Sequence, residues 1–320
     1  MSAAGGRAAV IAALLANAGI AVSKFVAFLF TGSSSMLAEA VHSVADTGNQ
    51  GLLLLGGRRA ARSPDAEHPF GYGMDRYFYA FVVALVLFSV GSLFALYEGY
   101  EKLKHPHEID APQVAIGVLL VAIMLESFSF RTAYRESRKV KPAGQSWPGF
   151  IRHSKNPELP VVLLEDTAAL VGLVFALCGV SFTLLFDQPR WDGIGTLAIG
   201  VLLGAVAFVL AVEMKSLLIG EAATPTDVER IRTALVDGEI TRVIHLRTVH
   251  VGPESVLVAA KVAFAPDAEM AQVAKAINAA EDRVRAAVPT VSHMYLEPDL
   301  YRAALAEQSD RQRKDSVAGM

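Results

Sequence analysis

The chain has 320 residues, of which 53% are hydrophobic and 19% charged, and its formal net charge is −3. Soluble globular chains carry about 25% charged residues, so the composition excludes a disordered chain and a collagen repeat and favours an integral membrane protein with a smaller soluble part. The single cysteine excludes an intrachain disulfide and a cluster of thiolate metal ligands. The small net charge gives no reason to expect nucleic acid as a partner.

Six apolar stretches are long enough to cross a membrane, which takes roughly 20 apolar residues. The predicted spans are Ala8–Phe30, Met36–Gly57, Tyr77–Leu103, Pro112–Ala133, Pro160–Phe186 and Gly193–Leu217. The first is longer than the apolar core of a signal peptide, and no small-residue cleavage site leads from it into a soluble sequence. We therefore expect six transmembrane helices in residues 1–217.

The distribution of lysine and arginine predicts the orientation. Positive charges gather in the loop between the second and third spans and in the loop between the fourth and fifth: Arg58, Arg59, Arg62, Arg76, and Arg135, Arg138, Lys139, Lys141, Arg152, Lys155. Positively charged loops remain in the cytoplasm, so both termini are expected there. The lack of a signal or transit sequence and the alanine- and arginine-rich composition favour a bacterial inner membrane.

Residues 218–300 change in character and predict a small soluble domain. The periodicity indicates, in order, a helix from Pro225, strands Val243–Val251 and Ser255–Phe264, a helix over Ala268–Val288 and a strand Val291–Leu296. The order αββαβ predicts a ferredoxin-like α+β domain. The charged tail, residues 301–320, is expected to be flexible.

Ionisable side chains within two of the spans are the candidate functional residues, because each costs at least about 2.5–3.5 kcal/mol in the membrane. His42 and Asp46 are separated by four positions in the second span and lie on one helical face, which Asn49 continues. Glu165 and Asp166 lie in the fifth span. Two neighbouring helices that present His42, Asp46 and Asp166 would enclose one divalent ion.

The types of these residues narrow the chemistry. Without sulfur ligands, imidazole and carboxylate suit Zn²⁺, Co²⁺, Ni²⁺, Fe²⁺ or Mn²⁺. The same groups bind protons, and metal binding requires them deprotonated. We therefore hypothesise a site that holds either a metal ion or protons. The alternative is a structural His–Asp hydrogen bond, and Lys24 and Glu126 are interpreted as a charge-balancing pair or as anchors at the lipid interface.

Several segments resemble the cation diffusion facilitators, a family of six-span exporters of zinc and related metals. They are Ala38–Asp46, which reads AEAVHSVAD, the loop Asp65–Gly73, which reads DAEHPFGYG, and the linker Lys215–Glu221, which reads KSLLIGE. Asp46–Leu53 and Leu164–Ala169 resemble the zinc transporter nine-like branch of that family.

The resemblance implies a homodimer formed through the cytoplasmic domain and the membrane helices, metal export driven by proton influx, and a site with two residues on each of spans two and five. His42, Asp46 and Asp166 match three of the four positions. Val162 stands where the family has a histidine, and Asn49 or a water is the expected fourth ligand. Glu165 is the weaker candidate, because it points about 100° away from Asp166 on a regular helix.

Other sites of the family are altered in this sequence. The family's loop site would use Asp65 and His68, but Tyr72 occupies its last position, so we expect a structural turn and at most a weak metal site. The histidine-rich site of the cytoplasmic domain is expected to be absent.

The sequence thus predicts a secondary transporter without catalytic residues or a cofactor, which exports a divalent metal cation, first of all zinc, in exchange for protons. A Mn²⁺ or Fe²⁺ exporter of the same fold and a non-transporting metal sensor or scaffold remain as alternatives. An intramembrane metalloenzyme is disfavoured, because no H-E-x-x-H motif is present.

Overall fold

The computed structural model describes residues 18–109 and 111–301, without the side chains of residues 86–88. The chain divides into two compact units, and each is described by itself. The helical unit comprises the residues up to Ser63 together with Met74–Leu218, and the second unit comprises Pro64–Gly73 and the residues from Ile219 onward. The predicted tail lies outside the described residues, apart from Tyr301.

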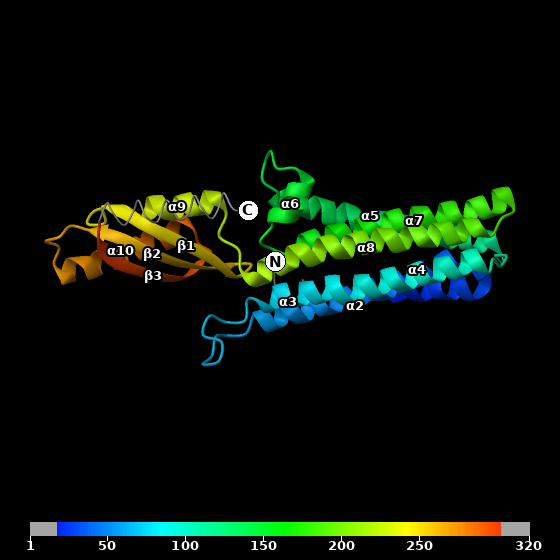
Figure 1. The fold of residues 1–320 in the computed structure, drawn as a ribbon, viewed down its shortest axis with the longest axis horizontal. Helices are drawn as coiled ribbons and strands as arrows, with labels where there is room; N and C mark the ends of the chain where they lie inside the picture. The colour runs from blue at the N-terminus through cyan, green and yellow to red at the C-terminus, as the bar shows by residue number, and fades with distance from the viewer. Residues whose placement is uncertain (1–17, 110, 302–320) are drawn as a thin grey trace. The chain divides into compact units, whose positions relative to one another are not determined.

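The helical unit consists of long helices that run side by side (Figure 1). Its elements are a helix over Ala18–Thr31, α2 (Ser34–Ala60), α3 (Asp75–Val82), the π-helical segment η1 (Val83–Phe88), α4 (Ser89–Lys104), α5 (Pro112–Val140), α6 (Trp147–His153), α7 (Glu158–Phe186) and α8 (Arg190–Ile219). The helices α3, η1 and α4 form one continuous span.

Among the residues that the structure describes, four helices are long and apolar enough to cross a membrane: Asp75–Lys104, α5, α7 and α8. They correspond to the last four predicted spans, so the chain is a multi-pass helical membrane protein. The second predicted span forms the 27-residue helix α2, which is more polar than these four because it carries buried ionisable side chains and ends in two arginines. Part of the first predicted span, residues 8–17, lies outside the described residues.

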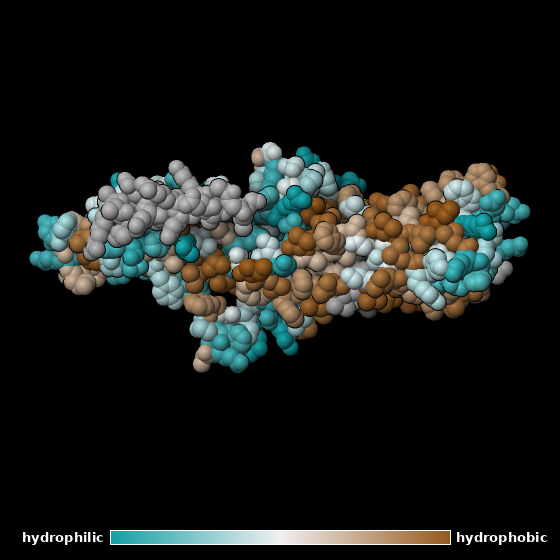
Figure 2. Space-filling model, viewed as in Figure 1, coloured by the Kyte–Doolittle hydropathy of each residue, from teal (hydrophilic) through white to brown (hydrophobic). Residues whose placement is uncertain are grey.

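The outer surface of the helices fits contact with lipid. Figure 2 shows hydrophobic residues along the helices and hydrophilic residues near their ends. Large apolar side chains such as Met124 and Phe128 on α5 and Phe208 on α8 are exposed. An apolar surface of this extent on a soluble monomer would promote association, whereas in a bilayer it is matched to the hydrocarbon.

Asp192 of α8 holds the first turn of α2 in place. Its carboxylate accepts hydrogen bonds from the Ser34 amide at 2.8 Å, from the Ser33 hydroxyl at 2.9 Å and from the Ser35 amide at 3.3 Å. The first amides of a helix have no partner within the helix and attract a negative charge. This contact fixes the position of α2 along α8, and with it the position of the polar residues further along α2.

The second unit has the predicted order αββαβ: α9 (Pro225–Leu235), β1 (Arg242–Gly252), β2 (Ser255–Phe264), α10 (Met270–Ala287) and β3 (Val291–Leu300). In the three-stranded sheet, β2 lies in the centre, antiparallel to β1 and parallel to β3. Alternate residues of β2, from Val256 to Val262, pack with Ile231 of α9 and Val284 of α10 in one core. The prediction of a small α+β domain is confirmed.

Candidate functional site

The polar residues of α2 that the sequence singled out are buried. His42, Asp46 and Asn49 face the interior of the helical unit, as the helical spacing predicted, together with Glu39 and Ser43. His42 Nδ1 lies 3.4 Å from Asp46 Oδ1, one turn further along the helix. Five polar side chains therefore share one buried face of α2.

A pocket brings α2, α5 and α7 together around acidic side chains. It is lined by Asp46, Glu126, Glu165 and Asp166, with Ile20, Ser43 and Ala169 completing the wall. The structure thus brings Asp46 and Asp166 to one pocket, as the sequence predicted for these two carboxylates. His42 is not among the lining residues and reaches the pocket only through its neighbour Asp46.

Glu165 and Asp166 both line this pocket although they are adjacent in α7. The helix α7 contacts both α2 and α5, so adjacent side chains of α7, which point about 100° apart, can face different neighbouring helices and still line one pocket. Glu165 lies close to Asn49 of α2, and Asp166 accepts a hydrogen bond of 3.1 Å from the Ser129 hydroxyl of α5. The Oε2 atom of Glu165 is buried, and no hydrogen-bond partner for it is found among the described residues.

The donor atoms of these residues do not converge on one point. Among residues 18–109 and 111–301, no three His, Cys, Asp or Glu side chains are close enough together to hold a metal ion. The pocket therefore gathers the carboxylates without forming a finished coordination sphere, and an ion bound there would require side-chain or helix movement.

The interpretation of Lys24 and Glu126 as a charge-balancing pair holds only at longer range: the positive charge of Lys24 acts on Glu126, but its direct partners lie on α2. Lys24 donates hydrogen bonds to Glu39 at 3.1 Å and to Ser43 at 2.8 Å, and so forms a buried ion pair with α2 instead. Glu126 lines the acidic pocket. The sequence could not show whether Glu39 or Glu126 is the partner of Lys24. Helical spacing gives the face of the helix on which a residue lies, but not which helix packs against that face.

The loop residues Asp65, His68 and Tyr72 form a closed turn. Tyr72 donates a hydrogen bond of 2.6 Å to one carboxylate oxygen of Asp65, and the amides of Glu67 and His68 donate to the other oxygen. These hydrogen bonds hold the pKa of Asp65 below its usual value, the one from Tyr72 having the largest effect. The carboxylate is committed to the turn, which agrees with the structural role predicted for this loop.

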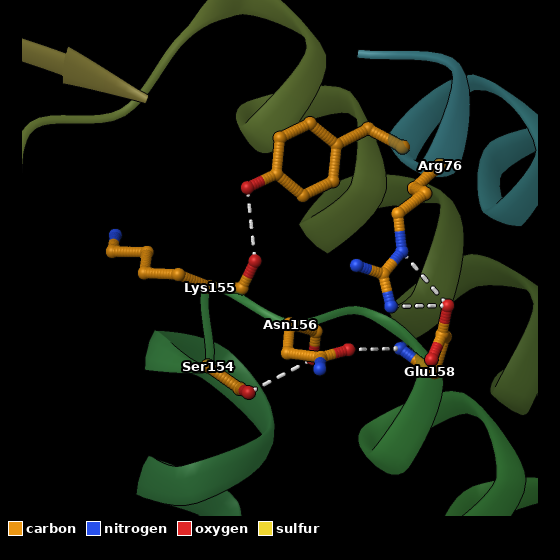
Figure 3. A network of polar contacts seen from close by, with 6 residues as sticks. Arg76, Ser154, Lys155, Asn156 and Glu158 are labelled. Carbon is orange, nitrogen blue, oxygen red and sulfur yellow. Dashed lines mark hydrogen bonds and ion pairs between the residues drawn. The ribbon is translucent and has the colours of Figure 1, made fainter. Parts of the chain in front are cut away.

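A second polar network joins the beginnings of α3 and α7 (Figure 3). The Arg76 guanidinium donates two hydrogen bonds, of 2.9 and 2.6 Å, to one oxygen of Glu158. The hydroxyl of Tyr77 donates to the carbonyl oxygen of Lys155 at 2.9 Å. These contacts fix the start of the helix that carries Glu165 and Asp166.

Glu126, which lines the pocket, and Ser129, which donates a hydrogen bond to Asp166, were not predicted as part of the site. Their signal in the sequence is an acid in the fourth predicted span with a serine three positions later, which places both on one face of a helix. From the sequence, Glu126 was interpreted with Lys24 as a charge-balancing pair or as an anchor at the lipid interface, and not as part of the site.

Comparison with known proteins gives a consistent result for the helical unit. A sequence model of the cation efflux transmembrane domain matches residues 10–219. The human proton-coupled zinc antiporter SLC30A9, a mitochondrial protein, is 34% identical over 223 residues, which is 69% of this chain and 39% of the relative.

Two further relatives extend the likeness. The Xenopus laevis protein of the same name is 36% identical over 243 residues, 75% of this chain and 44% of that protein. The metal tolerance protein C4 of Arabidopsis thaliana is 30% identical over 261 residues, 80% of this chain and 56% of that protein. The chain therefore spans less than two thirds of the length of these curated relatives.

Proposed function

Because the chain belongs to the cation efflux family, we propose that it is a secondary transporter that exports a divalent metal cation, zinc in the first place, from the cytoplasm in exchange for protons. The observation that carries this proposal is the pocket between α2, α5 and α7, where Asp46 and Asp166 meet inside an apolar helical unit. Buried carboxylates within a membrane-spanning unit mark a path for ions or protons.

In this proposal Asp46 and Asp166 supply negative charge and His42 supplies a nitrogen ligand. Two carboxylates balance the charge of one divalent cation, which makes entry of the ion into the apolar interior less costly. Metal binding needs all three groups deprotonated, so occupancy by metal and occupancy by protons exclude each other. Alternation of the pocket between the two sides of the membrane then couples the two fluxes.

The family has a histidine ligand at the position of Val162, and this chain lacks it. In its place we propose Asn49 or a water, and as a further candidate Glu165. Asn49 is buried on the same face of α2 as His42 and Asp46, and Glu165 lines the pocket beside it. Asp65 and His68 remain a weak metal site at most, because the Asp65 carboxylate already accepts three hydrogen bonds from the loop.

The placement in the cell is part of the same proposal. The positively charged loops put both termini in the cytoplasm, and the membrane is the inner membrane of a bacterium; the mitochondrial location in the names of the relatives is a property of those proteins. The chain is proposed to consist of a transporter domain, residues 1–217, a cytoplasmic domain, residues 218–300, through which two copies dimerise, and a charged tail, residues 301–320.

Transport in reconstituted vesicles tests the proposal. Asp46→Ala and Asp166→Ala are expected to abolish zinc uptake that depends on a pH gradient, while the exposed Glu136 on α5 serves as the control in Glu136→Ala. Each variant must keep the melting temperature of the unaltered protein in detergent. Normal uptake by either aspartate variant would refute the assignment of the site.

A Mn²⁺ or Fe²⁺ exporter is the second candidate, and the lining of the pocket favours it. All ionisable residues in the pocket lining are carboxylates. His42 is not part of the lining and contacts Asp46, which is. Oxygen ligands suit Mn²⁺ better than they suit zinc. Uptake measured with Zn²⁺, Mn²⁺, Fe²⁺, Co²⁺ and Ni²⁺ in turn decides between the two. Metal binding without any flux would indicate the sensor or scaffold instead.

A further inference from the structure

We propose that Glu126 of α5 is a further oxygen ligand of the divalent cation, so that three helices, α2, α5 and α7, hold the ion. The inference rests on the proposed function and adds a residue to its site. It assigns a role to the one acid in the middle of α5, on a helix that the sequence did not connect with the metal.

The packing of α5 directs Glu126 to the pocket. Ser129 lies three positions after Glu126, so both occupy one face of the helix, and the Ser129 hydroxyl donates a hydrogen bond of 3.1 Å to Asp166. The contact fixes this face of α5 against the carboxylates of α7. Glu126 therefore lines the same pocket as Asp166, on a different helix.

The exposure of residues near Glu126 in α5 shows which face of the helix points to lipid and which points inward. Met124 is 69% exposed and Phe128 75% exposed, and both are apolar. Glu126 itself is half-buried. An anchor at the lipid interface would share the exposed face, whereas Glu126 is turned toward the other acids, where its negative charge repels theirs. Such a gathering of carboxylates is unfavourable unless a cation or protons neutralise it.

The resident positive charge offsets this repulsion only in part. The charge of Lys24 acts on Glu126 and Asp46, but its ammonium group is hydrogen-bonded to Glu39 and Ser43, and one lysine stands against the four carboxylates of the pocket lining. For Glu126, no ion pair within 4.0 Å is found in the part of the chain that the structure describes.

A second observation points to a ligand. The Oε2 atom of Glu165 is buried in the same group of helices without a hydrogen-bond partner among the described residues, and the whole residue is only 4% exposed. A buried carboxylate oxygen without a partner costs free energy. After the side-chain or helix movement that a metal site here requires, a divalent cation held by Glu165, Asp46 and Glu126 would satisfy this oxygen and remove the repulsion among the acids.

The sequence of α7 explains why a ligand from α5 is needed. Val162, one turn before Asp166, carries an apolar side chain, so α7 offers no imidazole there. Glu126 approaches from α5 and supplies a donor from a different direction. A carboxylate in place of an imidazole makes the site richer in oxygen and shifts its preference toward harder divalent ions.

Metal binding by the full chain in lipid nanodiscs tests the inference. Zn²⁺ affinity is measured by titration calorimetry for the unaltered protein and for Glu126→Gln, with Glu136→Gln on the same helix as the control, because Glu136 is exposed. We expect Glu126→Gln to bind Zn²⁺ at least about tenfold more weakly and Glu136→Gln to bind normally. The absorption spectrum of bound Co²⁺ is expected to change only in Glu126→Gln, which a purely structural role would not produce.

Two further variants keep the outcomes separate. Glu126→His offers a different metal ligand and is expected to restore affinity with a new Co²⁺ spectrum, which also covers the case in which Glu126→Gln folds poorly. Asp46→Asn tests the proposed function itself. If Asp46→Asn abolishes binding while Glu126→Gln binds with normal affinity and spectrum, the inference is overturned and the proposed function stands. Normal binding by both variants would overturn the two together.

Discussion

Lys24 and Glu39 form an ion pair of 3.1 Å in the interior of the helical unit, and their side chains are 1% and 0% exposed. The pair joins the helix Ala18–Thr31 to α2 beside the polar face that leads to Asp46. Two charges taken out of water are tolerated only while they remain together. The pair therefore fixes the rotation of α2 about its axis, which decides that His42 and Asp46 face inward.

Removing one charge of this pair is expected to destabilise the protein strongly. Lys24→Met leaves Glu39 buried without its counter-charge, which costs about 3–5 kcal/mol in comparable pairs. Unfolding in detergent, followed by circular dichroism, measures the loss. The double variant Lys24→Met with Glu39→Gln is expected to recover much of it, because no uncompensated charge remains. Equal stability of the unaltered protein and Lys24→Met would contradict the structural role of the pair.

A change at Asp192 is expected to loosen the start of α2. Asp192→Asn removes the negative charge from four donors at the start of that helix, the hydroxyls of Ser33 and Ser35 and the amides of Ser34 and Ser35, and the loss of such charged hydrogen bonds costs about 1–3 kcal/mol. Thermal unfolding in detergent provides the measurement. Asp187→Asn is the matched control, since Asp187 is an exposed residue in a left-handed conformation that asparagine also adopts. An equal effect of both variants would argue against the capping role.

The turn at Asp65 predicts a pH dependence outside the membrane. The Tyr72 hydroxyl and loop amides stabilise the ionised carboxylate and lower its pKa, so this contribution to stability is complete above the unfolded pKa of about 3.9. It is lost as the pH falls through the lower pKa of the folded state. Tyr72→Phe is expected to raise the pKa of Asp65 toward its usual value. Carboxyl chemical shifts of labelled aspartate, followed with pH, measure the change; an unaltered pKa would show that Tyr72 has no such effect.

The polar face of α2 was predictable because the spacing of residues within a single helix determines which of them share a face. The spacing of His42, Asp46 and Asn49 places them on one side whatever packs there, and the cost of ionisable groups in lipid predicts that this side is buried. The two carboxylates of the site, Asp46 and Asp166, were likewise predicted to meet. The αββαβ order of the second unit followed from the alternation and turn residues at Gly252 and Pro253, which separate β1 from β2.

Contacts between helices were not predictable in the same way. The partner of Lys24 is Glu39 and not Glu126, since the choice depends on which helix packs against which. The role of Asp192 depends on a contact with Ser34, 158 positions earlier in the chain, which no local pattern encodes. Glu126 was not assigned to the site for the same reason: the sequence gives its face of the helix, but not the neighbour of that face, Asp166.

Zinc uptake into vesicles that contain the purified chain tests the central claim most directly. With an imposed pH gradient, the account predicts that the unaltered protein accumulates zinc at a rate that rises with the gradient and that Asp166→Ala gives only the background of empty vesicles. Uptake at the same rate with and without the gradient, or by Asp166→Ala as fast as by the unaltered protein, would contradict it.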